Sequence, residues 1–160
     1  MISNNSGYLK EVSKNDCKLI FHWSNDPEVR KNSLTKNKIT FVQHKKWFYS
    51  KINEDNSFMW IYFLKNNQPS GLIRFESISN RYFISYLLDS NYRGKKISKK
   101  MIIHGIEKFA ILKPKVKKIF AKVLKDNLIS FKVLKSIGFK LINNNEAVCK
   151  LFYEIKNETR

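Results

Sequence analysis

Six residues around one glycine, Arg93-Gly94-Lys95-Lys96-Ile97-Ser98, form the stretch best suited to bind an anion. They follow an apolar run typical of a strand and open a helical pattern. The first N–H groups of a helix lack partners within the helix, and the helix dipole is positive there, so such an end can hold a phosphate group. A glycine turn with solvated lysines would show the same residues, and this stretch alone leaves both interpretations open.

A second pattern follows the next strand, where Asn127-x-x-Ser130 leads into Lys135-Ser136-Ile137-Gly138-Phe139. Asn127 by itself is typical of a helix N-cap, and Gly138 before an apolar residue is typical of a helix C-cap. The appearance of this pattern and the basic turn in one chain is hard to attribute to capping alone. We therefore interpret them as a functional pair of motifs.

The elements that must position these motifs can be predicted from capping patterns and hydrophobic periodicity. Ser13 with Asp16, and Thr40 with Gln43, have the spacing of capping boxes, so each pair predicts a helix start. Pro27 interrupts the chain between these helices. Apolar or alternating runs predict strands at residues 8–12, 57–65, 72–78, 81–88, 118–124, 139–142 and 147–155, and periodic apolar residues predict helices at 95–113 and 126–139.

This order of elements predicts the fold class. Three consecutive strands with short turns indicate an antiparallel meander, and the later strand–helix–strand stretch adds a parallel portion. We expect a single mixed α/β (α+β) domain over residues 1–160, with helices flanking a central, mostly antiparallel sheet. A chain of 160 residues, 42% of them hydrophobic, can bury one core without metal or disulfide support.

The remaining composition bounds the cellular context. Cys17 and Cys149 are far apart and match no metal-binding spacing, so we expect reduced structural thiols and no metal. The first residues lack the pattern of a secretory signal, and no apolar run approaches the roughly 20 residues of a membrane span. These features lead us to expect a cytoplasmic protein without a membrane partner.

The net charge of +18 raises the possibility of a nucleic-acid-binding module. Only five of the 31 cationic residues are Arg, the residue best suited to bidentate phosphate and base recognition, and the lysines are spread along the whole chain. We therefore regard nucleic acid as an unlikely partner. A charge of this size still favours anionic over cationic ligands through long-range attraction.

The two motifs resemble the cofactor-binding signature of the GNAT family of N-acetyltransferases. That signature runs Arg/Gln-x-x-Gly-x-Gly/Ala and then Asn-x-x-Ala/Ser-x-x-x-Tyr-x-x-x-Gly-Phe, and the order of strands and helices is similar over nearly the whole chain. The resemblance implies the GNAT fold and acetyl-CoA as cosubstrate, with its diphosphate on the amides of residues 95–98. It also implies that the pantetheine arm pairs with the strand edge near Leu87 and Leu88 and is bound by Asn127.

The chain departs from the signature at three positions. Lys96 stands where the family usually has Gly, and Ser98 where it has Gly or Ala. Leu134 stands where many members carry the Tyr that protonates the leaving thiolate. If an acid is needed, Ser130 or a water is the candidate, and the thiol could also leave unprotonated. A catalytically inactive acyl-CoA-binding module therefore remains an alternative.

The stretch between residues 22 and 48 is the richest in potential acceptor-binding groups. It carries Arg30, Asn32, Ser33, His44, Trp47 and Phe48, which offer hydrogen-bond donors and aromatic faces to a polar anion. The ordinary alternatives are an exposed polar residue for His44 and core packing for Trp47 and Phe48, and we expect core packing for one of these two. The patterns W-x-N-D-P-x-V-R-x-x-S and H-x-x-W-F are similar to those of the N-acetyltransferases of pseudaminic-acid-type pathways. This resemblance implies a UDP- or other nucleotide-linked amino sugar as acceptor, with His44 at the diphosphate and with Trp47 and Ser33 beside the sugar or base.

Direct attack on a thioester requires a neutral amine, so a base or a water chain must accept a proton. Glu76, in an apolar alternation, is the candidate base, although an outward-facing strand carboxylate is an equal alternative. Asp89 is better explained as a turn cap, and a backbone N–H near Leu87 could stabilise the oxyanion. A protein N-terminus or another small amine is the alternative acceptor. An uncovered edge among the late strands also makes a homodimer possible.

Overall fold

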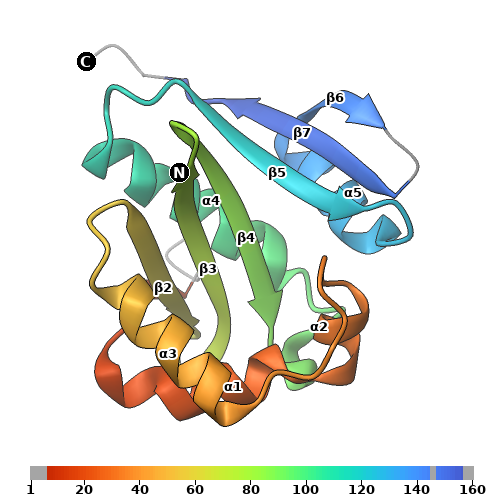
Figure 1. Ribbon diagram of the computed structural model, residues 1–160. Coiled ribbons are helices and arrows are strands. Elements are labelled where there is room, and N and C mark those ends of the chain that lie inside the picture. Colours follow the sequence, from red (N-terminus) through yellow and green to blue (C-terminus); the bar gives the residue numbers. More distant parts are fainter. Residues whose placement is uncertain (1–6, 145–146, 157–160) are drawn as a thin grey trace.

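Seven strands within the described part of the chain, residues 7–144 and 147–156, form one sheet in the order β1-β2-β3-β4-β5-β7-β6. The structure is a computed structural model, shown in Figure 1. The strands are β1 (Tyr8–Glu11), β2 (Ser57–Phe63), β3 (Pro69–Ile78), β4 (Arg81–Leu88), β5 (Lys118–Leu124), β6 (Lys140–Asn144) and β7 (Val148–Glu154). All neighbouring strands are antiparallel except β4 and β5. The predicted mixed, mostly antiparallel sheet is confirmed.

The helices of the described residues lie where capping and periodicity place them, with one addition. They are α1 (Cys17–Ser24), α2 (Pro27–Lys31), α3 (Phe41–Ile52), α4 (Ile97–Leu112) and α5 (Leu128–Ile137), with 3-10 turns η1 (Lys14–Asp16) and η2 (Ser90–Tyr92). The Thr40–Gln43 capping box is present, since Gln43 N–H donates to Thr40 Oγ1 at 3.2 Å and Thr40 N–H donates back to Gln43 Oε1 at 3.0 Å. At the other predicted start, the Ser13 N–H donates to the Asp16 carboxylate at 2.7 Å.

Two local predictions need correction. The break at Pro27 is itself the start of helix α2, because the Asp26 carboxylate caps the N–H groups of Glu28 and Val29 and Pro is well suited to the first helical position. Helix α4 begins at Ile97, two residues later than predicted. The reason is that Lys96 has a left-handed backbone (φ 59°), which a regular right-handed helix cannot include.

The helices cover both faces of the sheet. Helices α1 and α3 lie on one face of β2–β4, and α4 lies on the other (Figure 1). Alternating strand residues accordingly divide into two cores. Ile61 and Leu72 pack with Ile20 and Phe48 from α1 and α3. Larger side chains of the opposite face pack with α4 and α5, and these include Trp60, Phe75, Ile84, Met101, Phe109, Leu134 and Phe139.

The β4–β5 pair is the feature of the fold that creates a site. The two strands pair over only three residues, from Tyr82 opposite Ile119 to Ile84 opposite Ala121. Beyond Ile84 they diverge, which Figure 1 shows as an opening between the lower half of β4 and the right half of β5. The backbone of residues 85–88 therefore remains paired with β3 on one side and faces the opening on the other. A segment of extended chain can reach this edge.

The outer strands of the sheet are β1 and β6, and on β6 the side chains of Leu141 and Ile142 are exposed. Strand β6 is the uncovered edge through which the expected homodimer would form. Cys17 and Cys149 are both buried. Within residues 7–144 and 147–156, no helix combines the length and the apolar character that crossing a bilayer requires.

Candidate active site

A cavity of about 800 Å³ connects the two faces of the sheet through the opening between β4 and β5. Its lining includes Ser85 and Leu87, which face α1 and α3, and also Ile84 and Tyr86, which face α4 and α5. The other walls come from the α2–α3 loop, from α3 and β3, and from β5 and α5. These lining residues include Arg30, Asn32, Ser33, Lys38, His44, Trp47, Arg74, Glu76, Lys122, Asn127, Ser130 and Leu134. One continuous space thus contacts the second motif and the predicted acceptor region.

The basic turn reaches α4 through two left-handed residues. Gly94 has φ 73° and Lys96 has φ 59°. No atom lies within 4 Å of the place a Cβ would take on Gly94, so its backbone angle, and not crowding, favours glycine there. Lys96 is the N-cap of α4, and no side chain caps the first turn. The first N–H groups of α4 thus have the arrangement that binds phosphate in other proteins.

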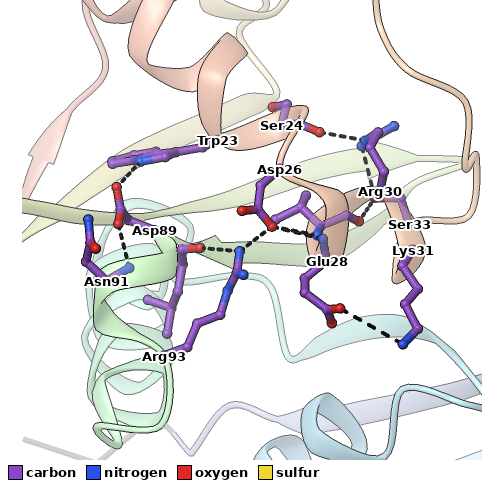
Figure 2. Close-up of polar contacts among 12 residues, drawn as sticks. Trp23, Ser24, Asp26, Glu28, Arg30, Lys31, Ser33, Asp89, Asn91 and Arg93 are labelled. Atoms are coloured by element: carbon purple, nitrogen blue, oxygen red, sulfur yellow. Dashed lines mark hydrogen bonds and ion pairs between the residues drawn. The ribbon is translucent and has the colours of Figure 1, made fainter.

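The cations of this turn differ in their surroundings. Arg93 Nη2 donates to Asp26 Oδ1 at 2.6 Å (Figure 2) and to the Leu88 carbonyl at 3.3 Å. The Lys95 ammonium lies 5.6 Å from the centre of the Tyr92 ring. Arg93 therefore braces the turn against α2 with one arm of its guanidinium, a structural contact that the sequence did not predict.

Both capping interpretations of the second motif are confirmed. Asn127 Oδ1 accepts a hydrogen bond from Ser130 N–H at 3.1 Å, and Gly138 ends the helix with φ 116° and an N–H donated to the Leu134 carbonyl at 3.3 Å. Asn127 also lines the cavity, so capping and a place in the site are combined in one residue. The cap fixes the start of α5 beside the strand opening.

A phenol lies beside Ser130 although Leu134 stands where the signature described above has a tyrosine. Leu134 is 1% exposed and belongs to the core under α5. The Tyr86 hydroxyl approaches from β4 and lies 2.6 Å from Ser130 Oγ. Burial raises the pKa of Tyr86, and the hydrogen bond with Ser130 lowers it in part. No sequence pattern singles out Tyr86, because on its own it is an ordinary strand aromatic.

The W-x-N-D-P pattern builds the wall of the cavity instead of contacting its interior. Trp23 Nε1 donates to Asp89 Oδ2 at 2.8 Å (Figure 2), and Asp89 also caps η2 through the Asn91 N–H, as the turn-cap interpretation requires. The Asn25 amide both donates to the Ile39 carbonyl at 2.8 Å and accepts from its N–H at 2.9 Å. These bonds hold the loop between α2 and α3 in place.

Arg30 and Ser33 hold the same loop from inside. Arg30 donates to the Ser24 carbonyl at 2.6 Å, to the Thr35 carbonyl at 3.0 Å and to Ser33 Oγ at 2.9 Å, while Ser33 Oγ donates to the Val29 carbonyl at 2.6 Å. Burial lowers the pKa of Arg30, and the neighbouring charge of Arg74 lowers it further. The two guanidinium groups are therefore close enough to repel each other within one cavity.

Arg74 and Trp47 pack against each other on the acceptor side of the cavity, and both are half-buried. The Arg74 guanidinium carbon lies 4.9 Å from the centre of the Trp47 ring, and Arg74 Nε donates to Ser85 Oγ at 3.1 Å. Burial lowers the pKa of Arg74, and the charge of Glu76 partly offsets this effect. Of the two aromatic residues of H-x-x-W-F, Phe48 is fully buried in the core, and Trp47 is the one that lines the cavity.

His44 needs a correction. Its side chain is 1% exposed, so the ordinary alternative of an exposed polar residue is wrong. Nε2 lies 2.9 Å from the Cys17 carbonyl, and the ring packs against Phe21, Trp47 and Phe48. Burial lowers the pKa of His44 despite this hydrogen bond, which favours the neutral imidazole. His44 forms part of the cavity wall beside Trp47, and its role at a diphosphate stays a prediction.

Glu76 lies in the cavity at the closed end of the opening. It pairs across the sheet with Phe83, which in turn pairs with Phe120 of β5. Its Oε1 lies 3.5 Å from Arg74 Nη1 and 3.8 Å from Lys51 Nζ, and it has no hydrogen-bond partner among the described residues. The carboxylate therefore sits between two cations with one buried oxygen still able to accept a hydrogen bond.

The other predicted residues take simple places. Asn32 is the C-cap of α2. Both Asn32 and Leu87 line the cavity. Leu88 pairs with Gly71 of β3, and Ile97 and Ser98 begin α4. Arg74 and Tyr86 line the cavity and were not predicted from the sequence. The alternation of residues 72–78 could have revealed Arg74, because it shares a strand face with Glu76.

Comparisons with known proteins agree with this architecture. The family model described as Acetyltransferase (GNAT) domain matches residues 8–140. The acetyltransferase PseH of Campylobacter jejuni is 27% identical over 146 residues, covering 91% of this chain and 87% of that protein.

Solved structures show the same fold. A domain from Methanocaldococcus jannaschii matches with a TM-score of 0.80 and 22% identity over 94% of this chain and 99% of that one. The spermidine N-acetyltransferase of Vibrio cholerae, solved with CoA and spermine, matches with a TM-score of 0.83 and 12% identity over 94% and 96%. With most of its length matched by the family model, the chain belongs to the GNAT family of acetyltransferases.

Proposed function

We propose that this enzyme transfers the acetyl group of acetyl-CoA to the amine of a nucleotide-linked amino sugar, such as a UDP-sugar. The observation that carries the proposal is the Arg74 guanidinium, which lies over Trp47 inside the cavity. A cation beside an indole face suits a ligand that combines a diphosphate with a flat base. The similarity to the Campylobacter jejuni acetyltransferase PseH supports the transfer of an acetyl group.

The residues present fit acetyl-CoA. The uncapped first turn of α4, with Lys95 and Lys96 beside it, provides N–H groups and positive charge for the diphosphate. The edge of residues 85–88 offers backbone groups to the amides of the pantetheine arm, and Asn127 lines the same opening. When bound, acetyl-CoA supplies an activated acyl group. These residues bind and orient it, and the surrounding apolar side chains exclude water.

The charge of the cavity selects among acceptors. Four cations line it (Arg30, Lys38, Arg74 and Lys122), and the one carboxylate among the lining residues, Glu76, already has two cationic neighbours. Such a cavity attracts an anionic acceptor and repels a polyamine. The structural likeness to the spermidine enzyme of Vibrio cholerae therefore extends to the fold and, in this proposal, not to the acceptor.

The reaction we propose is direct attack of the neutral amine on the thioester carbonyl. Glu76, with a buried oxygen open to a hydrogen bond, receives the proton of the amine or orients it. A backbone N–H near Leu87, on the strand edge that faces the opening, donates to the developing oxyanion.

The proposal is tested by initial rates of acetyl transfer to four acceptors: a UDP-linked 4-amino sugar, the same amino sugar without its nucleotide, spermidine, and a peptide with a free α-amine. We expect kcat/KM to be highest for the UDP-sugar and to fall as salt rises, because the attraction is electrostatic. A preference for spermidine or for the peptide would show that the acceptor class is wrong.

Arg74 provides the variant test. Arg74→Gln should raise the KM for the UDP-sugar by about 10-fold or more, the loss expected for one charge-assisted hydrogen bond, with a smaller change for the acceptor without a nucleotide. Arg81→Gln is the matched control, since Arg81 is exposed and lies over Phe120 outside the cavity lining. Equal effects of both substitutions would contradict the assignment.

A further inference from the structure

The hydroxyl pair of Tyr86 and Ser130 lies where the two halves of the cavity meet. Tyr86 is two residues beyond Ile84, the last β4 residue paired with β5, so its side chain projects from the strand at the start of the opening. Ser130 lies in the first turn of α5, and the two hydroxyl oxygens are 2.6 Å apart. Both residues line the cavity, together with Asn127.

The reaction requires a proton at this place. A thiolate expelled into a partly apolar opening is poorly solvated, so protonating it removes a costly charge. Leu134 cannot donate a proton, and its side chain is fully packed in the core. Among the described residues that line the cavity, Tyr86 carries the one phenol, and it reaches α5 from the strand on the opposite side of the opening.

We propose that Tyr86 is the general acid of this enzyme and that Ser130 positions its hydroxyl. The proposal rests on the acetyl transfer proposed above and deepens it. It replaces Ser130, the acid candidate from the sequence, by a residue on a different element. Tyr86 donates its proton to the departing sulfur. The Ser130 hydroxyl holds the phenol in place by a hydrogen bond and afterwards passes a proton from solvent back to it.

The step balances. The amine nitrogen forms a bond to the acetyl carbon, and the bond between this carbon and sulfur breaks. The sulfur takes the phenolic proton of Tyr86, which gives CoA as a thiol. The proton lost from the amine nitrogen passes to a base or to solvent, and Tyr86 regains one proton from solvent through Ser130. The net reaction converts an amine and acetyl-CoA into an amide and CoA, with no other reactant.

The electrostatic surroundings keep the donor protonated. Burial raises the pKa of Tyr86 above the ordinary value for tyrosine, while the Ser130 hydrogen bond lowers it in part. The phenol is therefore neutral at pH 7. Desolvation also raises the pKa of the departing thiol, so the opening favours a protonated sulfur over a thiolate. The charged side chains lining the cavity are Arg30, Lys38, Arg74, Glu76 and Lys122.

The kinetic test compares Tyr86→Phe with Tyr82→Phe. Tyr82 is on the same strand and the same face, but its hydroxyl bonds Asn56 at 3.0 Å, outside the cavity lining. We expect Tyr86→Phe to lower kcat by about 10²-fold or more with little change in the KM for acetyl-CoA, because a general acid acts in the transition state. Tyr82→Phe should retain wild-type turnover. Equal turnover of the two variants would overturn the proposal.

A binding measurement gives a readout independent of turnover. The ultraviolet absorbance of the thiolate reports the ionisation of CoA bound to the protein. A phenol that donates to sulfur favours the thiolate, so the bound thiol should ionise at lower pH in the wild type than in Tyr86→Phe. If CoA binds both proteins and its thiol ionises at the same pH in both, the role of Tyr86 is overturned and the proposed function stands. Failure of the wild type to bind CoA would overturn the proposed function and this role together.

Ser130→Ala separates the two hydroxyls. Because Ser130 is a positioning residue, Ser130→Ala should lower kcat less than Tyr86→Phe does. Ser130→Thr, which keeps a hydroxyl, should restore part of the rate. A larger loss from Ser130→Ala than from Tyr86→Phe would assign the proton to Ser130 and overturn the proposal.

Discussion

The carboxylate of Asp26 accepts a 2.6 Å hydrogen bond from the guanidinium of Arg93, and this ion pair joins the acceptor wall to the basic turn (Figure 2). Asp26 also caps α2, while Arg93 also donates to the Leu88 carbonyl at the end of β4. A second bond between the same regions links Trp23 to Asp89. The helices beside the acceptor side are thus tied directly to the turn that faces the proposed cofactor site.

Asp26→Asn isolates this ion pair, because Asn is an equally good helix cap. We expect it to lower the free energy of unfolding at pH 7 by about 1 kcal/mol. The matched control is Glu28→Gln, since Glu28 is more exposed and lies 4.0 Å from Lys31. Chemical denaturation checks both, and an equal loss in the two variants would contradict a special role for the Asp26–Arg93 pair.

The Asp26 effect should also depend on pH. Burial opposes ionisation of Asp26, but the hydrogen bonds from Arg93 and from the α2 N–H groups outweigh it, so its pKa lies below the ordinary value. The stabilisation is therefore present above the unfolded pKa of about 3.9 and is lost as the pH falls through the folded pKa. The stability difference between wild type and Asp26→Asn should shrink in this acidic range. A difference that stays constant would contradict the assignment.

Lys96→Gly should stabilise the protein. A left-handed backbone costs a side-chain-bearing residue about 1–2 kcal/mol, and the greater flexibility of glycine in the unfolded chain offsets part of the gain. We expect a net increase of about 0.5–1 kcal/mol in the free energy of unfolding. Lys95→Gly is the control, because Lys95 does not have a positive φ, and it should destabilise. The same sign for both substitutions would contradict this account.

His44 makes stability fall on mild acidification. Its folded pKa is lowered by burial, so below the unfolded pKa of about 6.5 the unfolded chain binds a proton that the folded protein does not. The free energy of unfolding should decrease by up to about 1.4 kcal/mol per pH unit from this group, between pH 6.5 and its folded pKa. His44→Gln should remove this slope, and His22→Gln, at an exposed position, should retain it. An unchanged slope in His44→Gln would contradict the burial of a neutral imidazole.

Glu76→Gln tests the proposed proton acceptor. The amide keeps the shape of the side chain but accepts protons poorly, so kcat should fall by about 10²-fold with small changes in both KM values. Glu107→Gln, on the exposed side of α4, should leave turnover unchanged. Normal turnover of Glu76→Gln would mean that the ion pairs with Arg74 and Lys51 are its whole role and that the proton passes to another group.

The helix boundaries could be predicted from the sequence because they depend on residues close together in the chain. Thr40 with Gln43, Asn127 with Ser130, and Gly138 all act within a few residues, and each helix boundary they predict is present. Helix α2 was missed because Pro27 was interpreted as a break, although Asp26 before it is a capping residue. The strands and the meander were predicted from equally local patterns, namely alternation and short turns, whereas the position of β7 between β5 and β6 was not predicted.

The site required information that no local pattern holds. His44 is buried because Cys17, distant in the chain, offers its carbonyl to the ring. Tyr86 becomes a candidate acid only because β4 and β5 diverge after Ile84 and α5 brings Ser130 to its hydroxyl. Arg74 is proposed to bind an anion because its guanidinium lies over Trp47 inside the cavity. Each of these roles follows from tertiary contacts between residues at least ten positions apart.

The most direct test of the central claim, that one cavity binds CoA and an anionic acceptor, is the thermal midpoint measured with CoA, UDP, both together, and spermidine. A ligand at about 100 times its dissociation constant adds roughly 2.7 kcal/mol of stability, which gives a clear shift. We expect CoA and UDP each to raise the midpoint, the pair to raise it further, and spermidine to leave it unchanged. A shift with spermidine and none with UDP would contradict the account.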